Sequence, residues 1–232
     1  KLMENKNPRH VLSSSVPRIA PNAVSAYIAM QHKFRGPNIA ISTACSSGGN
    51  AIAYAAQFIQ SGSSDVAITG GAECPITPFT YAAYQSLRVL SKGVLGKKKS
   101  PRPFDKNRDG FVLGEGAVIF VLEELEKARK RSAKIYAELV GYGSNCGVYH
   151  MAAPDPSGED AALAMEEALG FAGIDKREVD FISAHGTATH ANDICEAKAI
   201  RLVFGDEAKR FHVSSTKSQV GHTIGAAGAI GA

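Results

Sequence analysis

Residues 42–57, STACSSGGNAIAYAAQ, place one thiol, Cys45, between a short β-rich run and a helical pattern rich in alanine. The helical pattern at 47–61 contains no charged residue and is apolar on nearly all its turns, which predicts a buried helix. Cys45 would then lie at the positive end of the helix dipole, beside free backbone N–H groups, where a thiolate is favoured. A buried structural cysteine is the alternative interpretation.

The sequence on both sides of this stretch alternates between β-rich runs and helical patterns, as is typical of layered α/β folds. Because most of the expected strands are apolar throughout, we expect helices on both faces of the sheet. The expected strands are residues 38–43, 65–71, 116–123, 134–143, 179–186 and 211–216. The expected helices are residues 21–33, 47–61, 78–90, 123–131, 158–172 and 192–204, and residues 91–111 are interpreted as a surface loop.

Composition excludes several classes of function. The chain has 232 residues, of which 44% are hydrophobic and 21% are charged, and no apolar run reaches the length of a membrane span. The net charge of +4 is spread along the sequence apart from Lys97, Lys98 and Lys99, so we expect neither nucleic-acid nor membrane binding. An acidic protein partner for these lysines stays possible.

The four cysteines form no CxxC pair, which argues against a zinc site and against a disulfide framework and favours a reducing compartment. Both ends of the sequence look cut, since the start has no signal pattern and the end, GAAGAIGA, stops within a helical pattern. We therefore expect the chain to be a piece of a longer polypeptide.

Two histidines occupy positions where strands end, and loops at such positions build sites in α/β folds. His185 lies in ISAHGTATHAND (182–193), and His222 lies in SSTKSQVGHTIGAAGA (214–229). A thiol nucleophile needs partners for proton transfer and charge stabilisation, and imidazole is the usual one. We therefore expect the loops of Cys45, His185 and His222 to converge.

Four motifs together resemble those of the β-ketoacyl-acyl-carrier-protein synthases, nearest to the type II elongating enzymes: TACSSG, RPFDKNRDGFVLGEGA, AHGTATHAND and SSTKSQVGHTIGAAGA. The resemblance runs along nearly the whole chain. It implies a thiolase-like fold of five layers, αβαβα, with two similar halves at about 1–133 and 134–232. The chain would lack the family's first segment and last strands, including a glycine-rich acyl gate that supplies a second oxyanion N–H.

The resemblance also implies roles for individual residues. Cys45 would be the acyl-accepting nucleophile, and His185 and His222 would support decarboxylation and stabilise the enolate and oxyanion. Lys217 matches the family's lysine, with Glu196 as its partner, in a structural and electrostatic role rather than as a general base.

Further positions match residues that would contact the substrate. Thr187 and Thr189 would bind the phosphopantetheine arm, although helix capping or turn formation is an alternative for both. Tyr84 would lie beside the acyl pocket, whereas Phe111 would serve packing. The motif residues Asp105, Arg108 and Asp109 would hold a turn. Two positions depart from the family pattern: Gly147 replaces a common aspartate, and His190, which we do not expect to be catalytic, replaces a common proline.

The implied activity is that of an acyltransferase for fatty acid chain elongation, which condenses an acyl chain on Cys45 with malonyl-acyl carrier protein and releases CO₂. No metal and no bound cofactor is expected, because phosphopantetheine arrives on the carrier protein. A homodimer is expected, in the cytoplasm or in a plastid or mitochondrial matrix. The alternatives are a polyketide synthase ketosynthase, as a domain or subunit, and a non-catalytic chain-length subunit, against which Cys45 counts.

Overall fold

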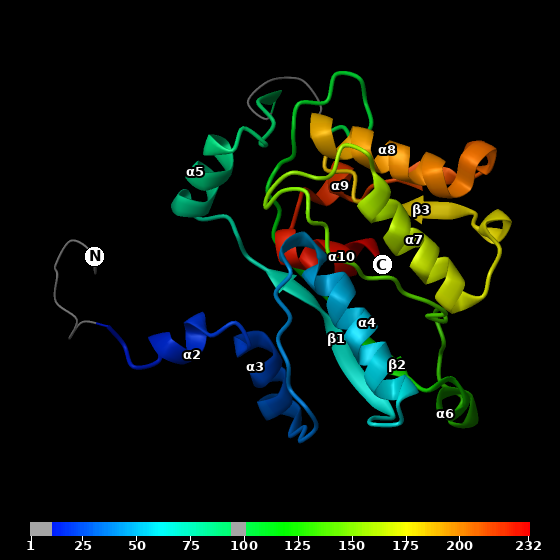
Figure 1. Cartoon of the computed structure of the whole chain (residues 1–232). Helices are drawn as coiled ribbons and strands as arrows, with labels where there is room; N and C mark the ends of the chain where they lie inside the picture. The colour runs from blue at the N-terminus through cyan, green and yellow to red at the C-terminus, as the bar shows by residue number, and fades with distance from the viewer. Residues whose placement is uncertain (1–10, 94–100) are drawn as a thin grey trace. The chain divides into compact units, whose positions relative to one another are not determined.

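The computed structural model describes residues 11–93 and 101–232, which divide into two compact units between Ser42 and Thr43 (Figure 1). Lys97, Lys98 and Lys99 lie outside the described residues. The first unit contains helices α2 (Ser15–Ile19) and α3 (Ala23–His32).

The segment after α3 is held on that helix by side-chain hydrogen bonds. The Ser25 hydroxyl donates to Asn38 Oδ1 over 2.8 Å, and Asn38 Nδ2 donates to the Ser25 carbonyl over 3.0 Å. The predicted helix at 21–33 is confirmed in type, with ends shifted by one or two residues.

Two small sheets organise the second unit. β1 (Val66–Glu73) pairs antiparallel with β2 (Gly116–Glu123), and β3 (Phe181–Ser183) pairs parallel with β4 (His212–Ser214). The parallel pair is connected through helix α8 (His190–Phe204), as a crossover between parallel strands requires.

One face of the β1–β2 sheet packs against helices α4 (Ser47–Gln60) and α10 (Ala227–Gly231) (Figure 1). Gly71 of β1 permits this close approach, because a Cβ there would lie 2.9 Å from Ala226 Cα and 3.4 Å from Gly48 Cα. The Cys45 end of α4 is thereby fixed on the sheet.

The opposite face of the β1–β2 sheet is exposed. Ile68 is 38% exposed, its cross-strand partner Val121 is 61% exposed, and Ile119 is 46% exposed. The expectation that helices cover both faces is therefore wrong for this sheet within the second unit, residues 43–93 and 101–232. Apolar composition predicted burial, but no helix described in this unit packs on this side.

Helix α4 is confirmed at the predicted position but is not buried on all sides. Gly48 and Ala56 are its buried residues, whereas Tyr54 is exposed. The prediction of a fully buried helix is wrong for the described part of the chain, because α4 packs mainly on β1 and α10.

The main apolar cluster lies between α7 (Glu159–Ala172) and α8, which pack side by side (Figure 1). It places α8 firmly beside β3 and β4, so the loop that precedes α8 has a rigid support. The buried members of this cluster are Ala162, Ala199, Ile200, Val203, Phe204 and Phe211.

The remaining predicted helices are confirmed, and their ends follow local capping. In α5 (Pro78–Ser86) the Thr77 hydroxyl accepts from the Thr80 amide over 3.1 Å, and proline occupies the first turn. In α6 (Leu125–Lys130) the Glu124 carboxylate caps the first turn. The shorter helical segments are η2 (Ala44–Ser46), η4 (Lys176–Glu178), η5 (Gly205–Lys209), α9 (Lys217–Val220) and η6 (Ile224–Ala226).

Two predicted strands do not form ladders in the described structure. Residues 38–43 and 134–143 have no regular secondary structure. Among the described residues, neither segment has a neighbouring strand with which it forms a ladder of hydrogen bonds. The other predicted strands are confirmed, two of them shortened to the three residues of β3 and of β4.

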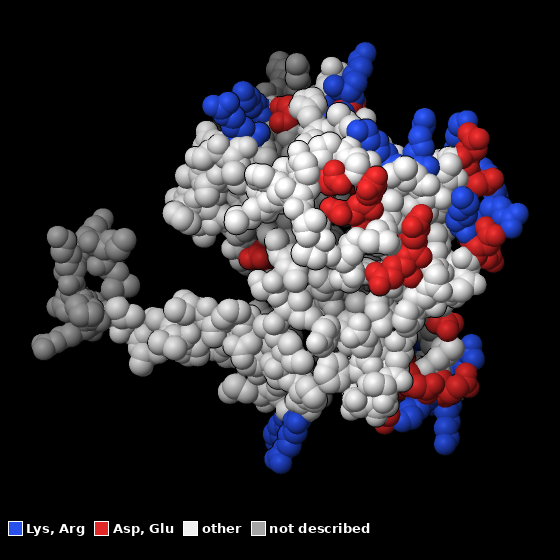
Figure 2. All heavy atoms as spheres, viewed as in Figure 1, with Lys and Arg blue, Asp and Glu red and all other residues white. Residues whose placement is uncertain are grey.

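Charged side chains of both signs are interspersed on the face shown in Figure 2. This agrees with the scattered cations of the sequence and with a net charge of only +4. Across residues 11–93 and 101–232, no helix combines the length and the apolar character needed to cross a bilayer.

Candidate active site

Cys45 lies in η2, immediately before α4, at a strained turn. Ala44 has φ 52°, a left-handed conformation that is uncommon for a residue with a side chain. The Ser47 hydroxyl accepts from the Thr43 amide over 2.9 Å and donates to the Ala44 carbonyl over 2.7 Å. These bonds hold the turn that presents the sulfur at the start of the helix.

His222 lies against the sulfur. Its Nε2 is 3.1 Å from Cys45 Sγ, and the residue is 2% exposed. Its Nδ1 accepts a hydrogen bond from the Ile224 amide over 3.2 Å, with Ile224 held at φ 46°. In the neutral ring the proton must therefore be on Nε2, so His222 presents an N–H donor toward the sulfur.

His185 completes the cluster. Its ring stands edge-on to that of His222, with centroids 5.4 Å apart and an interplanar angle of 84°. The Cys45 sulfur and one ring nitrogen of each histidine all lie within 4.8 Å of one another. The three predicted residues are therefore brought together by three separate loops.

The two histidines are neutral at physiological pH. Burial, with the charge of Lys217, lowers the pKa of His185 to about 4. Burial, with the charges of His185 and Lys217, lowers the pKa of His222 to about 3. Neutral imidazoles can donate hydrogen bonds without adding a proton-dependent charge to the site.

The expected thiolate is not favoured at Cys45. Burial raises the pKa of the thiol, and Glu73 adds to this effect, whereas Lys217 and a backbone hydrogen bond lower it. The prediction from the helix dipole is wrong in net direction, because desolvation disfavours the charged sulfur more strongly. Lys217 is the main opposing charge.

Lys217 and Glu196 are both buried, at 5% and 9% exposure. Burial lowers the pKa of Lys217, and the charge of Glu196 is the leading effect that opposes this shift. The Glu196 carboxylate accepts from the His185 amide over 2.6 Å and from the Gly186 amide over 2.8 Å. Glu196 therefore fixes the backbone of the His185 loop directly and acts on Lys217 electrostatically.

The two predicted substrate-binding threonines lie together in the same loop. Thr187 Oγ1 and Thr189 Oγ1 are 2.9 Å apart, and Thr189 Oγ1 accepts from the Asn192 amide over 3.3 Å. Thr189 is thus the N-cap of α8, which was the alternative considered for it. Since one of the two hydroxyls donates to the other, one hydroxyl proton of the pair remains to donate to a substrate.

Aromatic rings line one side of the site. Phe111 packs edge-on against His222 with centroids 5.0 Å apart, and Tyr84 packs edge-on against Phe111 at 5.7 Å. Burial raises the pKa of Tyr84, and the charge of Cys45 adds to this effect. Phe111 does serve packing, as predicted, but the ring that it packs against is that of His222.

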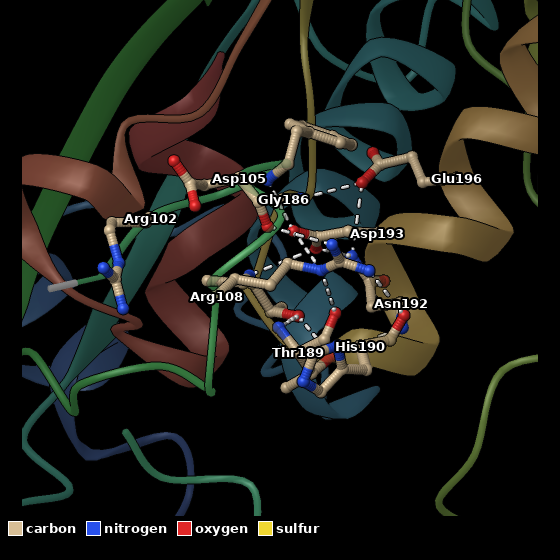
Figure 3. A network of polar contacts seen from close by, with 12 residues as sticks. Arg102, Asp105, Arg108, Gly186, Thr189, His190, Asn192, Asp193 and Glu196 are labelled. Atoms are coloured by element: carbon tan, nitrogen blue, oxygen red, sulfur yellow. Dashed lines mark hydrogen bonds and ion pairs between the residues drawn. The ribbon is translucent and has the colours of Figure 1, made fainter. Parts of the chain in front are cut away.

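Sequence reasoning missed the polar network behind the His185 loop, which includes Asn192 and Asp193 (Figure 3). Asn192 Nδ2 donates to Asp193 Oδ1 over 3.1 Å and to Glu196 Oε2 over 3.3 Å. The sequence does contain a signal for this network, since Asn192, Asp193 and Glu196 are polar residues in the first two turns of a predicted helix. Buried polar side chains need hydrogen-bond partners, and neighbouring loops can supply them.

The other cysteines lie outside the cluster. Cys74 and Cys146 are exposed, and Cys195 is buried in α8. Gly147, which departs from the family pattern, lies beside α7, and a Cβ there would be 2.7 Å from Asp160 Oδ2.

A cysteine with two histidines is also a donor set that zinc uses. A histidine that binds a metal normally donates its other ring N–H to an acceptor. At His222 the relation is reversed, since the Ile224 amide donates to Nδ1. The geometry favours a proton on Nε2, and with it donation to sulfur or to a developing oxyanion.

Comparisons with known proteins agree with this geometry. The family model "Beta-ketoacyl synthase, N-terminal domain" matches residues 1–128, and "Beta-ketoacyl synthase, C-terminal domain" matches residues 136–232. The chain is 44% identical to 3-oxoacyl-[acyl-carrier-protein] synthase 2 of Staphylococcus aureus over 99% of its length, and 45% identical to the enzyme of that name from Coxiella burnetii over 96%. It covers 57% and 54% of those relatives, about half of their length.

Solved structures show the same fold. A type II polyketide synthase ketosynthase in complex with its acyl-carrier protein superposes with a TM-score of 0.93 at 35% identity, over 97% of this chain and 55% of the other. A β-ketoacyl synthase from Burkholderia phymatum superposes with a TM-score of 0.92 at 37% identity, over 99% of this chain and 55% of the other. The predicted thiolase-like fold class is confirmed.

Proposed function

Because the chain belongs to the β-ketoacyl synthase family, we propose that its protein catalyses decarboxylative condensation of an acyl chain with a malonyl thioester in fatty acid elongation. The Cys45 sulfur attacks the acyl thioester, forms a new C–S bond and displaces the carrier thiol, which takes up a proton. Malonyl then loses CO₂, and the electron pair of the broken C–C bond forms an enolate. The enolate carbon attacks the acyl group on Cys45, and the thiolate leaves.

One observation carries this proposal: a thiol faces two neutral imidazoles, and one of them is held as an N–H donor. In a cysteine hydrolase the histidine is a general base, and its other nitrogen donates to an acidic or amide side chain. Here a backbone N–H points at His222 Nδ1, so the ring is suited to stabilise negative charge. An enolate and a tetrahedral oxyanion are the species that need such donors.

Further roles follow from this assignment. We assign His185 to the same charge stabilisation, Lys217 to the electrostatics of the nucleophile and Glu196 to support of the His185 loop. Thr187 and Thr189 hydrogen-bond the phosphopantetheine arm of the carrier, which arrives as part of the substrate. Tyr84 lies beside the acyl chain.

An acyl carrier protein is the proposed partner, supported by the solved ketosynthase that is in complex with an acyl-carrier protein. We also propose a homodimer, and two halves that divide near residue 133, between the regions matched by the two family models.

A polyketide ketosynthase is the second candidate, because the structural match to such an enzyme reaches a TM-score of 0.93. The names of the curated relatives favour the fatty acid pathway. A non-catalytic chain-length subunit is disfavoured, since Cys45 is present and lies beside both histidines.

The experiment incubates the full-length gene product with acyl-carrier protein carrying hexanoyl or malonyl groups. Mass spectrometry of the carrier should show the 3-oxo product two carbons longer, together with released CO₂. Release of free hexanoate without a 3-oxo product would instead identify a thioester hydrolase and refute the proposal. Repeated extension without reduction would favour the polyketide pathway.

A further inference from the structure

One segment of the chain bonds to the loops of both histidines. The Gly110 amide donates to the Ala188 carbonyl over 2.9 Å, which ties the segment to the His185 loop. The His222 amide donates to the Val112 carbonyl over 2.7 Å, and the Gly114 amide donates to the His222 carbonyl over 2.9 Å. We call residues 102–114 the strap.

Arg108 is a charged side chain of the strap that reaches the loop of residues 184–189, called here the His185 loop, and the start of α8 (Figure 3). Its Nε donates to the Thr189 carbonyl over 3.2 Å, and Nη2 donates to the His190 carbonyl over 3.1 Å. Its Nη1 donates to the Asp105 carbonyl over 3.0 Å within the strap. One rigid guanidinium therefore joins the last carbonyl of the His185 loop and the first carbonyl of α8 to the strap backbone.

Asp193 gives the guanidinium a charged partner. Arg108 Nε lies 3.5 Å from Asp193 Oδ2, with the two side chains 10% and 1% exposed. Asp193 also accepts from the Phe104 amide over 2.7 Å and from the Ala188 amide over 3.1 Å. A buried pair of this kind is strongly destabilised when one member is removed, because the other charge stays desolvated.

The loop that these bonds hold is strained. Ala188 has φ 65°, a left-handed conformation that a residue with a side chain rarely adopts, and it is fully buried. Such a conformation persists only where the surroundings impose it. The Ala188 amide donates to the Asp193 carboxylate, and the Ala188 carbonyl accepts from the Gly110 amide of the strap. These two hydrogen bonds hold the strained conformation.

We propose that Arg108 is a positioning residue for condensation: through the strap it fixes where the His185 loop stands relative to His222. The inference rests on the proposed function and adds to it a residue that does not touch the reacting atoms. Cys45 is held by a different set of bonds, those of the Thr43–Ser47 turn. Arg108 therefore affects decarboxylation, through the position of His185, and binding of the pantetheine arm, through the positions of Thr187 and Thr189. It does not affect the reactivity of Cys45.

The test compares two arginines of the strap in the full-length gene product. Arg108→Met should leave alkylation of Cys45 by iodoacetamide and acyl loading near the wild-type rate. CO₂ release from malonyl-acyl carrier protein should fall on the order of ten- to a hundredfold, as expected for displaced catalytic groups. Arg108→Lys should recover part of the activity, since an ammonium can pair with Asp193 but cannot bond two carbonyls at once.

Arg102→Met is the matched control. Arg102 Nη2 donates to the Asn107 carbonyl over 2.6 Å and lies 3.8 Å from Asp109 Oδ1, so these bonds stay inside the strap. This variant should lower the melting temperature without changing the ratio of decarboxylation to loading.

The ratio of the decarboxylation rate to the acyl-loading rate is the deciding measurement. Equal losses of loading and decarboxylation in Arg108→Met, or an equal change of the ratio in Arg102→Met, would overturn the inference. Should Arg108→Met fail to fold, the same ratio measured in Arg108→Lys decides. A wild-type protein that neither loads acyl groups nor releases CO₂ would refute the proposed function instead.

Discussion

Replacing His222 with alanine tests the division of labour at the site. The change removes a buried ring whose Nε2 lies 3.1 Å from Cys45 Sγ. The Ile224 amide occupies Nδ1, so the lost group is an N–H donor at Nε2. Loss of one oxyanion donor costs about 2.7–4 kcal/mol, or roughly a hundredfold to a thousandfold in rate. Decarboxylation should fall by this factor, and acyl loading of Cys45 should persist.

A matched variant separates a donor from a base. His222→Gln keeps an N–H donor that can reach about the position of Nε2 but has no basicity, so it should retain more decarboxylation than His222→Ala. The assay follows release of radiolabelled CO₂ from malonyl-acyl carrier protein alongside acyl loading, measured by mass spectrometry. Equal loss of both steps in His222→Ala, with an unchanged circular dichroism spectrum, would show that His222 is needed to activate the thiol and not only to stabilise charge. So would a glutamine variant as inactive as the alanine variant.

Three further predictions concern charge and packing. Lys217→Met removes the main charge that lowers the pKa of Cys45, so alkylation of the thiol at neutral pH should slow several-fold and its pH profile should move upward; an unmoved profile would contradict this. Burial holds the pKa of His222 at about 3, below its unfolded value of about 6.5. The unfolded chain therefore binds one more proton than the folded chain between these pH values. As the pH is lowered from about 6.5 to about 3, the free energy of unfolding should decrease by about 1.4 kcal/mol per pH unit from this residue. Urea unfolding at several pH values should show a shallower acid slope in His222→Gln, and an unchanged slope would argue against burial as the cause. In α4, Gly48→Ala should lower the melting temperature because its Cβ would lie 2.7 Å from a backbone nitrogen of α10, whereas Gly49→Ala, with nothing within 4 Å, should raise it; the opposite order would show that the α4–α10 contact is wrong.

The sequence predicted helices well because their signals are local. Thr77 followed by Pro78 marks the start of α5, and the apolar pattern of 158–172 marks α7 between two glycines with positive φ. Strands were less predictable, since residues 38–43 and 134–143 have apolar patterns but no ladder partner among the described residues. Pairing is a property of two segments, and the pattern of one cannot establish it.

The candidate site was predictable as a set of residues but not as an electrostatic environment. Motif positions pointed to Cys45, His185 and His222, and the structure brings them together. The helix dipole predicted a thiolate, whereas burial raises the thiol pKa, because desolvation depends on groups packed from elsewhere in the chain. The Ile224 amide that sets the His222 proton belongs to a strained turn that no sequence pattern identified.

The roles of Phe111 and Arg108 depend on contacts across long stretches of sequence. Phe111 meets a ring at His222, and Arg108 bonds carbonyls at Thr189 and His190. Their motif was interpreted as a turn held by charges, which describes its local bonds. Its connection to both histidine loops appears only in three dimensions.

Peptide mapping after incubation with acyl-carrier protein shows which residue accepts the acyl group. The exposed thiols of Cys74 and Cys146 serve as internal controls for non-specific transfer. We expect one acyl group per chain, on Cys45, and none in Cys45→Ser. An acyl group on Cys74, Cys146 or Cys195, with Cys45 unmodified, would contradict this expectation.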